Sequence, residues 1–236
     1  MSYKLLSFNN PKIIKGEKIS NYLTAIMHLS PINTKICPYQ DVAGCKEACL
    51  NTAGRGGIIK KGETTNVIQE ARKRKTNLYL EDRDTFMSYL ITDIQKFVRY
   101  CEKKDKLPCI RLNGTSDIQW ETIQVNGQNI FEMFPDVQFY DYTKIAKRLG
   151  KTPDNYELMF SYSNAPDYQQ SVRKALKTDV PISVVFFGDM PTHFMGKEVI
   201  NGDESDIVNL SHKNKIVGLK YKSVGAGVDP LDSAFI

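Results

Sequence analysis

Three cysteines lie within thirteen residues of the chain: Cys37, Cys45 and Cys49. They share the segment KICPYQDVAGCKEACLNTAGRGG, which follows an apolar stretch ending in Ser-Pro. Thiolates are strong ligands of iron and zinc, and three of them leave one position of a metal centre open. The residue types and their spacing therefore predict a metal centre on this segment.

Two kinds of centre are compatible with three thiolates. A [4Fe-4S] cluster held by three protein sulfurs keeps one iron available for a substrate or cofactor. A closed structural zinc site needs a fourth ligand, for which His28 is a candidate because it ends the preceding strand. The spacing C-x7-C-x3-C is that of neither a zinc ribbon nor a zinc finger. Thiolates serve both metals, so iron and zinc both stay open at this point.

The composition favours reduced thiols. Five cysteines are an odd number, and the N-terminus lacks the apolar core and cleavage site of a secretory signal, so we expect no disulfide framework. Cys101 and Cys109 fall in apolar patterns and are expected in the core. The sequence contains no run of eighteen apolar residues. We expect a cytoplasmic protein that does not associate with a membrane.

The charge pattern permits a nucleic-acid partner without requiring one. The formal net charge is +5, and no polybasic tail is present. The densest basic run, Arg72 to Lys75, falls on an expected helix, where it would form a solvated face or steer a polynucleotide.

The elements that must position the cysteines alternate between strands and helices. An apolar stretch from Tyr22 to Leu29 predicts a buried strand. Further strands are expected at residues 109–112, 137–140, 157–162, 182–187, 198–200 and 216–221, and helices at 65–80, 82–101, 143–149 and 168–177. This order predicts a single α/β domain over residues 1–236, with residues 1–20 as an irregular lead-in. A partial or imperfect (β/α) barrel is the first expectation, and an open α/β sheet is the alternative.

Polar residues follow several of these strands. Since the carboxyl ends of parallel strands meet on one face, we expect them to converge near the cysteines. Asp117, Asp141 and Lys144 are the candidates for acid–base chemistry or for orienting a substrate. Glycines beside Arg55 suggest an anion-binding turn. The candidates for binding a cofactor or substrate are Asn113, Gly114, Thr115, Ser116, Ser161, Asn164 and Arg55.

The motifs resemble those of the phage gene product 88 family. They are CPYQDVAGCKEACLNTAGRG, IRLNGTSDIQWE, FPDVQFYDYTK, FSYSN, VVFFG and VINGDESD, and they span the chain from Tyr22 onwards. More distantly, a cysteine loop after the first strand and polar turns after the next two are similar to phage proteins related to radical S-adenosylmethionine (SAM) enzymes.

The second resemblance implies a radical-SAM-like barrel with a [4Fe-4S] cluster on Cys37, Cys45 and Cys49, and SAM as a further cofactor. The turn containing Asn113, Gly114, Thr115 and Asp117 would then receive the amino group of the methionine moiety. The chain departs from that pattern in two ways: the usual cysteine spacing is C-x3-C-x2-C, and no Gly-Gly-Glu turn follows the second strand.

These observations lead to two functional hypotheses. The first is a phage-type iron–sulfur enzyme, radical-SAM-like, that acts on a nucleic acid or a small metabolite in the host cytoplasm. The second is a phage accessory protein with a structural metal site that binds nucleic acid or a host component.

Overall fold

The computed structural model describes residues 4–8, 14, 17–18, 20–46, 49–203 and 212–221. Most of its strands belong to one sheet: β1 (Leu6–Ser7), β2 (Tyr22–Met27), β3 (Leu107–Arg111), β6 (Gln138–Thr143), β7 (Tyr156–Ser161), β8 (Ile182–Phe186), β9 (His193–Phe194), β10 (Lys197–Asn201) and β11 (Ile216–Lys220). Their order is β1-β2-β3-β6-β7-β8-β11-β10-β9. Every neighbouring pair from β2 to β10 is parallel, and β1 and β9 add to the two ends in antiparallel fashion.

The described strands form an open sheet, with β1 and β9 as its two edges, and no closure into a barrel is found among them. The α/β prediction is confirmed, and the alternative of an open sheet describes this architecture better than the barrel. After β8 the sequential order ends, because β11 lies between β8 and β10. The expected lead-in at residues 1–20 contributes the edge strand β1 in its described part.

The helices are α2 (Val67–Glu81), α3 (Arg83–Glu102), α4 (Ile130–Met133) and α5 (Gln169–Ala175). The first two match the prediction because the caps are local: Asn66 accepts from the amides of Ile68 and Gln69, and Asp82 accepts from that of Thr85. The prediction of a helix at residues 143–149 is wrong. Strand β6 runs to Thr143, and only the 3-10 turn η4 (Ala146–Arg148) follows.

The prediction at residues 168–177 holds in its centre, where the 3-10 turn η5 (Pro166–Tyr168) leads into α5. Two further strands, β4 (Gln124–Val125) and β5 (Gln128–Asn129), form a small separate hairpin. None of the described helices is long and apolar enough to cross a membrane.

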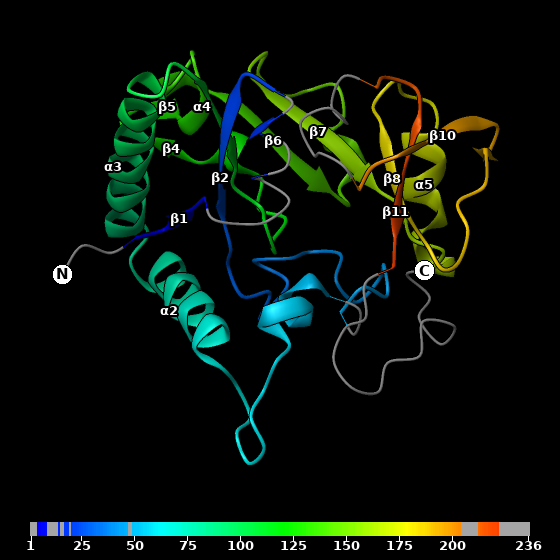
Figure 1. Ribbon diagram of the computed structural model, residues 1–236, viewed down its shortest axis with the longest axis horizontal. Coiled ribbons are helices and arrows are strands. Elements are labelled where there is room, and N and C mark those ends of the chain that lie inside the picture. The colour runs from blue at the N-terminus through cyan, green and yellow to red at the C-terminus, as the bar shows by residue number, and fades with distance from the viewer. Residues whose placement is uncertain are drawn as a thin grey trace.

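Helices cover one face of the large sheet. In Figure 1, α3 lies near one end of the row of strands and α5 near the other end, and both contribute buried residues to the main core. Buried residues of α3, among them Phe86, Leu90 and Ile94, recur at the three-to-four spacing of an amphipathic helix and join the main core. The other face carries a smaller apolar cluster of Cys109, Tyr140, Met159 and Val217. Cys101 and Cys109 are both fully buried, as predicted.

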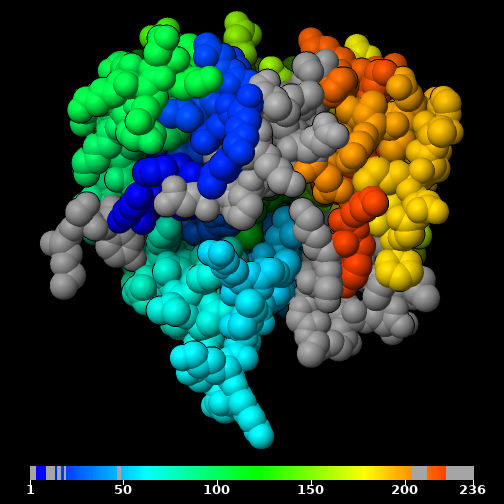
Figure 2. All heavy atoms as spheres, in the orientation of Figure 1, coloured from blue at the N-terminus to red at the C-terminus, as the bar shows by residue number. Residues whose placement is uncertain are grey.

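The connection from β2 to α2 carries the three cysteines, and we call residues 30–53 the cysteine loop. It lies below the strands in Figure 1, on the side where the parallel strands end. The 3-10 turn η1 (Leu50–Thr52) lies at its end, and a second turn, η2 (Gly54–Gly56), follows directly after it. The segment between η2 and α2 projects from the body in Figure 2, and the side chain of Ile58 there is 68% exposed.

The turn after β3 packs against the end of β2. The amide of Gly114 donates to the carbonyl of Met27 at 2.9 Å, and the hydroxyl of Thr115 donates to that of Leu29 at 2.5 Å. A Cβ atom at position 114 would lie 2.6 Å from the Met27 oxygen and 2.7 Å from Cγ2 of Ile26. Only glycine allows this approach, and it aligns the ends of both strands.

We expect Gly114→Ala to lower the free energy of unfolding by about 1–3 kcal/mol, because the added methyl group meets backbone that cannot move aside easily. Urea denaturation of the two proteins measures the difference. Thr122→Ala, on the exposed part of the same connection, is the control. Equal stability of Gly114→Ala and the parent chain would contradict the close packing of the two strand ends.

Candidate metal centre and strand-end network

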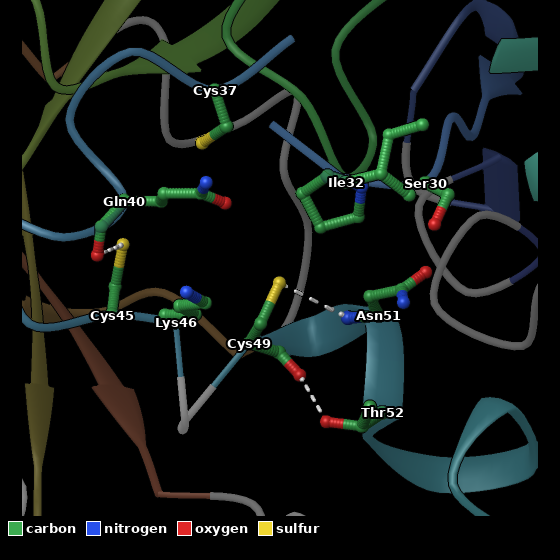
Figure 3. Close-up of a pocket in the computed structure, with 10 residues that line it drawn as sticks. Ser30, Ile32, Cys37, Gln40, Cys45, Lys46, Cys49, Asn51 and Thr52 are labelled. Atoms are coloured by element: carbon green, nitrogen blue, oxygen red, sulfur yellow. Dashed lines mark hydrogen bonds between the residues drawn. The ribbon is translucent and has the colours of Figure 1, made fainter. Parts of the chain in front are cut away.

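Cys37, Cys45 and Cys49 line one cavity of about 240 Å³. Figure 3 shows their sulfur atoms pointing toward the same space from three sides. The other lining residues are Ser30, Pro31, Ile32, Gln40, Lys46, Asn51 and Thr52. The cavity has room for several water molecules, each of which occupies about 30 Å³ in the liquid. The loop therefore gathers the three thiols around a space larger than one ion requires.

Hydrogen bonds from the strand ends hold the cysteine loop in place. The amide of Asp117, after β3, donates to the carbonyl of Ile36 at 2.9 Å, directly before Cys37. The hydroxyl of Ser163, after β7, donates to the carbonyl of Ala43 at 2.6 Å, two residues before Cys45. The positions of two of the three cysteines are thus fixed by residues far away in the sequence.

Cys49 caps η1. Its sulfur accepts a hydrogen bond from the amide of Asn51 at 3.4 Å. Such a bond stabilises a thiolate, and amide hydrogen bonds to ligand sulfurs are among the factors that tune iron–sulfur centres. Cys45 instead donates its S–H to the carbonyl of Gln40 at 3.7 Å.

Burial raises the pKa of all three thiols. For Cys37, the negative charges of Cys45, Asp117 and Cys49 raise the pKa further. The three thiols are therefore protonated when no cation lies among them. A metal centre would replace those protons, because its positive charge offsets both burial and the repulsion between thiolates.

Among the described residues, the three thiols do not form a ready-made site for one metal ion. Within the described part of the chain, no three His, Cys, Asp or Glu side chains form a group that could hold one metal ion. Tetrahedral zinc with bonds of about 2.3 Å brings its sulfurs to roughly 3.8 Å from each other. The described side chains at the cysteines are not gathered in that way. His28, the candidate fourth zinc ligand, does not line the cavity.

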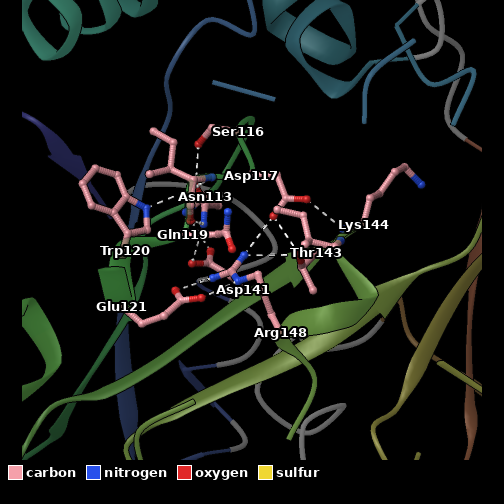
Figure 4. A network of polar contacts seen from close by, with 12 residues as sticks. Asn113, Ser116, Asp117, Gln119, Trp120, Glu121, Asp141, Thr143, Lys144 and Arg148 are labelled. Carbon is pink, nitrogen blue, oxygen red and sulfur yellow. Dashed lines mark hydrogen bonds and ion pairs between the residues drawn. The ribbon is translucent and has the colours of Figure 1, made fainter. Parts of the chain in front are cut away.

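Figure 4 shows a buried polar network, which the amide of Asp117 joins to the cysteine loop at Ile36. The carboxylate of Asp117 accepts from the hydroxyl of Thr143 at 2.8 Å, the amide of Lys144 at 2.8 Å and the guanidinium of Arg148 at 3.0 Å. Arg148 also forms two hydrogen bonds, of 2.7 and 2.8 Å, with Glu121. These bonds hold the end of β6 and explain why no helix begins there.

Asp141 is the second buried carboxylate, and three donors surround it. They are the amide of Asn113 at 2.7 Å, the side-chain nitrogen of Asn113 at 3.1 Å and the hydroxyl of Tyr156 at 2.9 Å. Burial raises the pKa of Asp141 to about 7, and the positive charge of Arg111 opposes the shift. The side-chain oxygen of Asn113 accepts from Ser116, from the amide of Ile118 and from the Trp120 indole. Asn113, Ser116 and Asp141 thus bind one another.

The Lys144 ammonium lies between the end of β7 and the cysteines. It donates to the carbonyl and hydroxyl oxygens of Ser161 and to the carbonyl of Tyr162, each at 3.1 Å. Burial lowers its pKa to about 8, while Cys45, Asp117 and Cys37 oppose that shift. Lys144 is therefore a fixed charge that acts on the thiols of Cys37 and Cys45.

The structure brings most of the predicted residues together but leaves two outside. Asp117, Asp141, Lys144, Asn113, Ser116 and Ser161 form the buried network, and Gly114 and Thr115 bind the end of β2. Asn164 and Arg55 are exposed, and neither lines the cavity. The network members that the sequence did not indicate are Glu121, Arg148 and Tyr156. Arg148 falls within the helix expected at residues 143–149, and nothing in the sequence marks it as buried.

Comparison with known proteins shows the family of the chain. The sequence model of the family described as Gene product 88 matches residues 4–229. This match confirms the first resemblance and does not extend to radical SAM enzymes. No curated protein and no solved structure matches the chain.

We expect Arg148→Met to lower the free energy of unfolding by about 3–5 kcal/mol, because it leaves the buried Asp117 without its cationic partner. Chemical denaturation measures the loss. Lys147→Met is the matched control, since its side chain is exposed on the same 3-10 turn, and it should change stability by no more than about 0.5 kcal/mol. Similar losses in both variants would contradict the role of the network.

Asp141 should make stability depend on pH. Its pKa in the folded chain is about 7, above the value near 4 of an unfolded chain. The stabilisation from its protonated form is complete below about pH 4 and is lost as the pH rises to about 7. Across this range the free energy of unfolding should fall more steeply for the parent chain than for Asp141→Asn. Denaturant titrations at several pH values, with the exposed Asp136→Asn as control, measure the two slopes, and parallel slopes would contradict the shift.

Proposed function

The chain belongs to the gene product 88 family, and we propose that it is an iron–sulfur enzyme of radical-SAM-like type whose [4Fe-4S] cluster is held by Cys37, Cys45 and Cys49. The observation that carries this proposal is the cavity that all three thiols line. The cavity is larger than a single ion requires, and this favours a cluster over one ion.

The chain's own residues would support such a cluster in distinct ways. The three cysteines bind it after losing their protons, and the Asn51 amide stabilises the sulfur of Cys49. Lys144 places a positive charge near the other two thiols. Three thiolates outweigh the charge of a [4Fe-4S] core, so this fixed cation favours the bound state. When bound, the cluster supplies one-electron transfer and an iron position for a cofactor such as SAM.

Asp117 and Asp141 act as positioning residues in this proposal. Both carboxylates are buried and surrounded by donors from the protein. They hold the ends of β3 and β6 and thereby the ammonium of Lys144. The polar groups of Ser30, Asn51 and Thr52 on the cavity wall are better placed to orient a bound molecule.

A small metabolite is the substrate class that the geometry favours. The cavity of about 240 Å³ would also have to hold the cluster, so it has room for only part of a small molecule. The basic run on α2 does not form one exposed face, because Lys73 and Arg74 are exposed whereas Arg72 and Lys75 are half-buried and bonded to Asn51 and Leu5. This division argues against α2 as a track for a polynucleotide.

Anaerobic reconstitution with iron and sulfide tests the proposal. We expect about four irons per chain, the broad absorbance of an iron–sulfur centre, and a paramagnetic signal after reduction. Addition of SAM should change that signal if the open iron binds it. Cys37→Ser, Cys45→Ser and Cys49→Ser should each lose most of the bound iron.

Cys101→Ala and Cys109→Ala are the controls, since both cysteines are buried away from the cavity. They should bind as much iron as the parent chain. Failure of the reduced, folded chain to bind a cluster would overturn the proposal. Tight binding of one zinc per chain would favour a structural metal site, and salt-sensitive binding of DNA or RNA would then favour an accessory protein.

A further inference from the structure

The side chain of Gln40 lies in the cysteine cavity, and the proposed binding of the cluster by three thiolates does not use it. Gln40 is only 5% exposed, and it lines the cavity together with the three cysteines. In Figure 3 its carboxamide extends into the space toward which the three sulfur atoms point. A neutral group with two N–H donors and one oxygen acceptor thus stands beside the thiols.

The backbone of Gln40 is bonded to two of the three cysteines. Its amide donates to the carbonyl of Cys37 at 3.3 Å. Its carbonyl accepts the S–H of Cys45 at 3.7 Å. The Cα atom of Gln40 is thereby tied to both cysteines, so the side chain keeps its place when they do.

The carboxamide of Gln40 has no hydrogen-bond partner among the residues that the structure describes. Two other polar side chains of the cavity wall differ in this respect. The side-chain oxygen of Asn51 accepts from Arg72 at 3.0 Å. The hydroxyl of Thr52 donates to the carbonyl of Cys49 at 3.0 Å. Buried side-chain amides are hydrogen-bonded in most native proteins, so an amide that is nearly buried and faces a cavity indicates a partner that enters the cavity.

The chemistry of the proposed cluster matches one end of this amide. Water can bond to the amide while the cavity holds no metal centre, but a cluster bound by all three cysteines takes the space in front of them. The surface of such a cluster consists of sulfur atoms, from sulfides and thiolates, that accept hydrogen bonds. The oxygen of the amide would meet sulfur atoms of like partial charge, so the Nε2 group is the end that faces them.

We infer that the Gln40 carboxamide donates a hydrogen bond to a sulfur atom of the bound cluster and raises its reduction potential, an inference that rests on the proposed function. Three thiolates make the loaded site negative, and one electron taken from an added reductant makes it more negative. A donated hydrogen bond stabilises the more negative state more strongly. Hydrogen bonds to the sulfurs are among the factors that set the potentials of these centres. Gln40 is then a positioning residue and not a ligand.

A redox titration of the reconstituted, full-length chain tests the inference. Dithionite supplies the electron, mediator dyes set the potential, and electron paramagnetic resonance measures the reduced fraction. Gln40→Leu keeps a similar volume and removes the donor, so its midpoint potential should be more negative than that of the parent chain. It should still bind about four irons per chain, since no ligand is lost.

Gln40→Glu is a second, independent variant. Its carboxyl group can donate while it is protonated, and it becomes a negative acceptor when it ionises. The midpoint potential of this variant should therefore fall with rising pH more steeply than that of the parent chain. Equal slopes in the two proteins would contradict a contact between this side chain and the cluster.

Gln124→Leu is the matched control, because it removes the same type of side chain from an exposed position on the small hairpin. It should keep the potential of the parent chain, and circular dichroism checks that each variant is folded. An unchanged potential in Gln40→Leu would overturn the inference. A more positive potential would also overturn it, because the amide oxygen would then face the cluster.

The iron content separates the remaining outcomes. If Gln40→Leu loses as much iron as Cys37→Ser, Gln40 is a ligand and the inference is wrong. If the parent chain binds no cluster, the proposed function fails and this inference fails with it. If the parent chain binds the cluster and Gln40→Leu has the same potential, this inference fails alone.

Discussion

Asp117 is the residue on which the site depends, because it acts through both its backbone and its side chain. Its amide holds the carbonyl of Ile36 next to Cys37, while its carboxylate binds Thr143, the Lys144 amide and Arg148. One buried residue thus joins the cysteine loop to the ends of β3 and β6. A buried carboxylate is stable only when donors and a cation surround it, and Arg148 and its neighbours meet that requirement.

Charge is arranged around the cavity in a consistent way. Lys144 lies on the side of Cys37 and Cys45, and Arg72 on the side of Cys49. Each cation is fixed by hydrogen bonds to the protein, Lys144 to Ser161 and Tyr162 and Arg72 to Asn51. Because Lys144 is buried and Arg72 is half-buried, these charges act more strongly on the thiols than surface charges would.

Local patterns allowed much of this structure to be predicted. The parallel strands, α2, α3 and the gathering of the three cysteines follow from apolar periodicity, caps and the rule that strand ends meet. The prediction of a helix after β6 was wrong because the end of that strand binds Asp117. The hydroxyl of Thr143 donates a hydrogen bond to this carboxylate, which lies 26 residues earlier in the sequence. Arg148 was missed, and Arg72 was expected on a solvated face, for a related reason. A buried arginine and an exposed one look alike until the carboxylate or carbonyl that binds it is known, and those partners are distant in sequence.

The anchoring of the cysteine loop has a consequence for the energetics of cofactor loading. Many small zinc domains fold only when the metal arrives, so the ion must compensate for the lost freedom of the chain. Here the strand ends already restrain the backbone at Ile36 and Ala43, and the helical cap orients Cys49. Such a site is preorganised: much of the entropy loss belongs to folding. A chelator that strips the proposed cluster should therefore leave behind a native apoprotein that can bind it again.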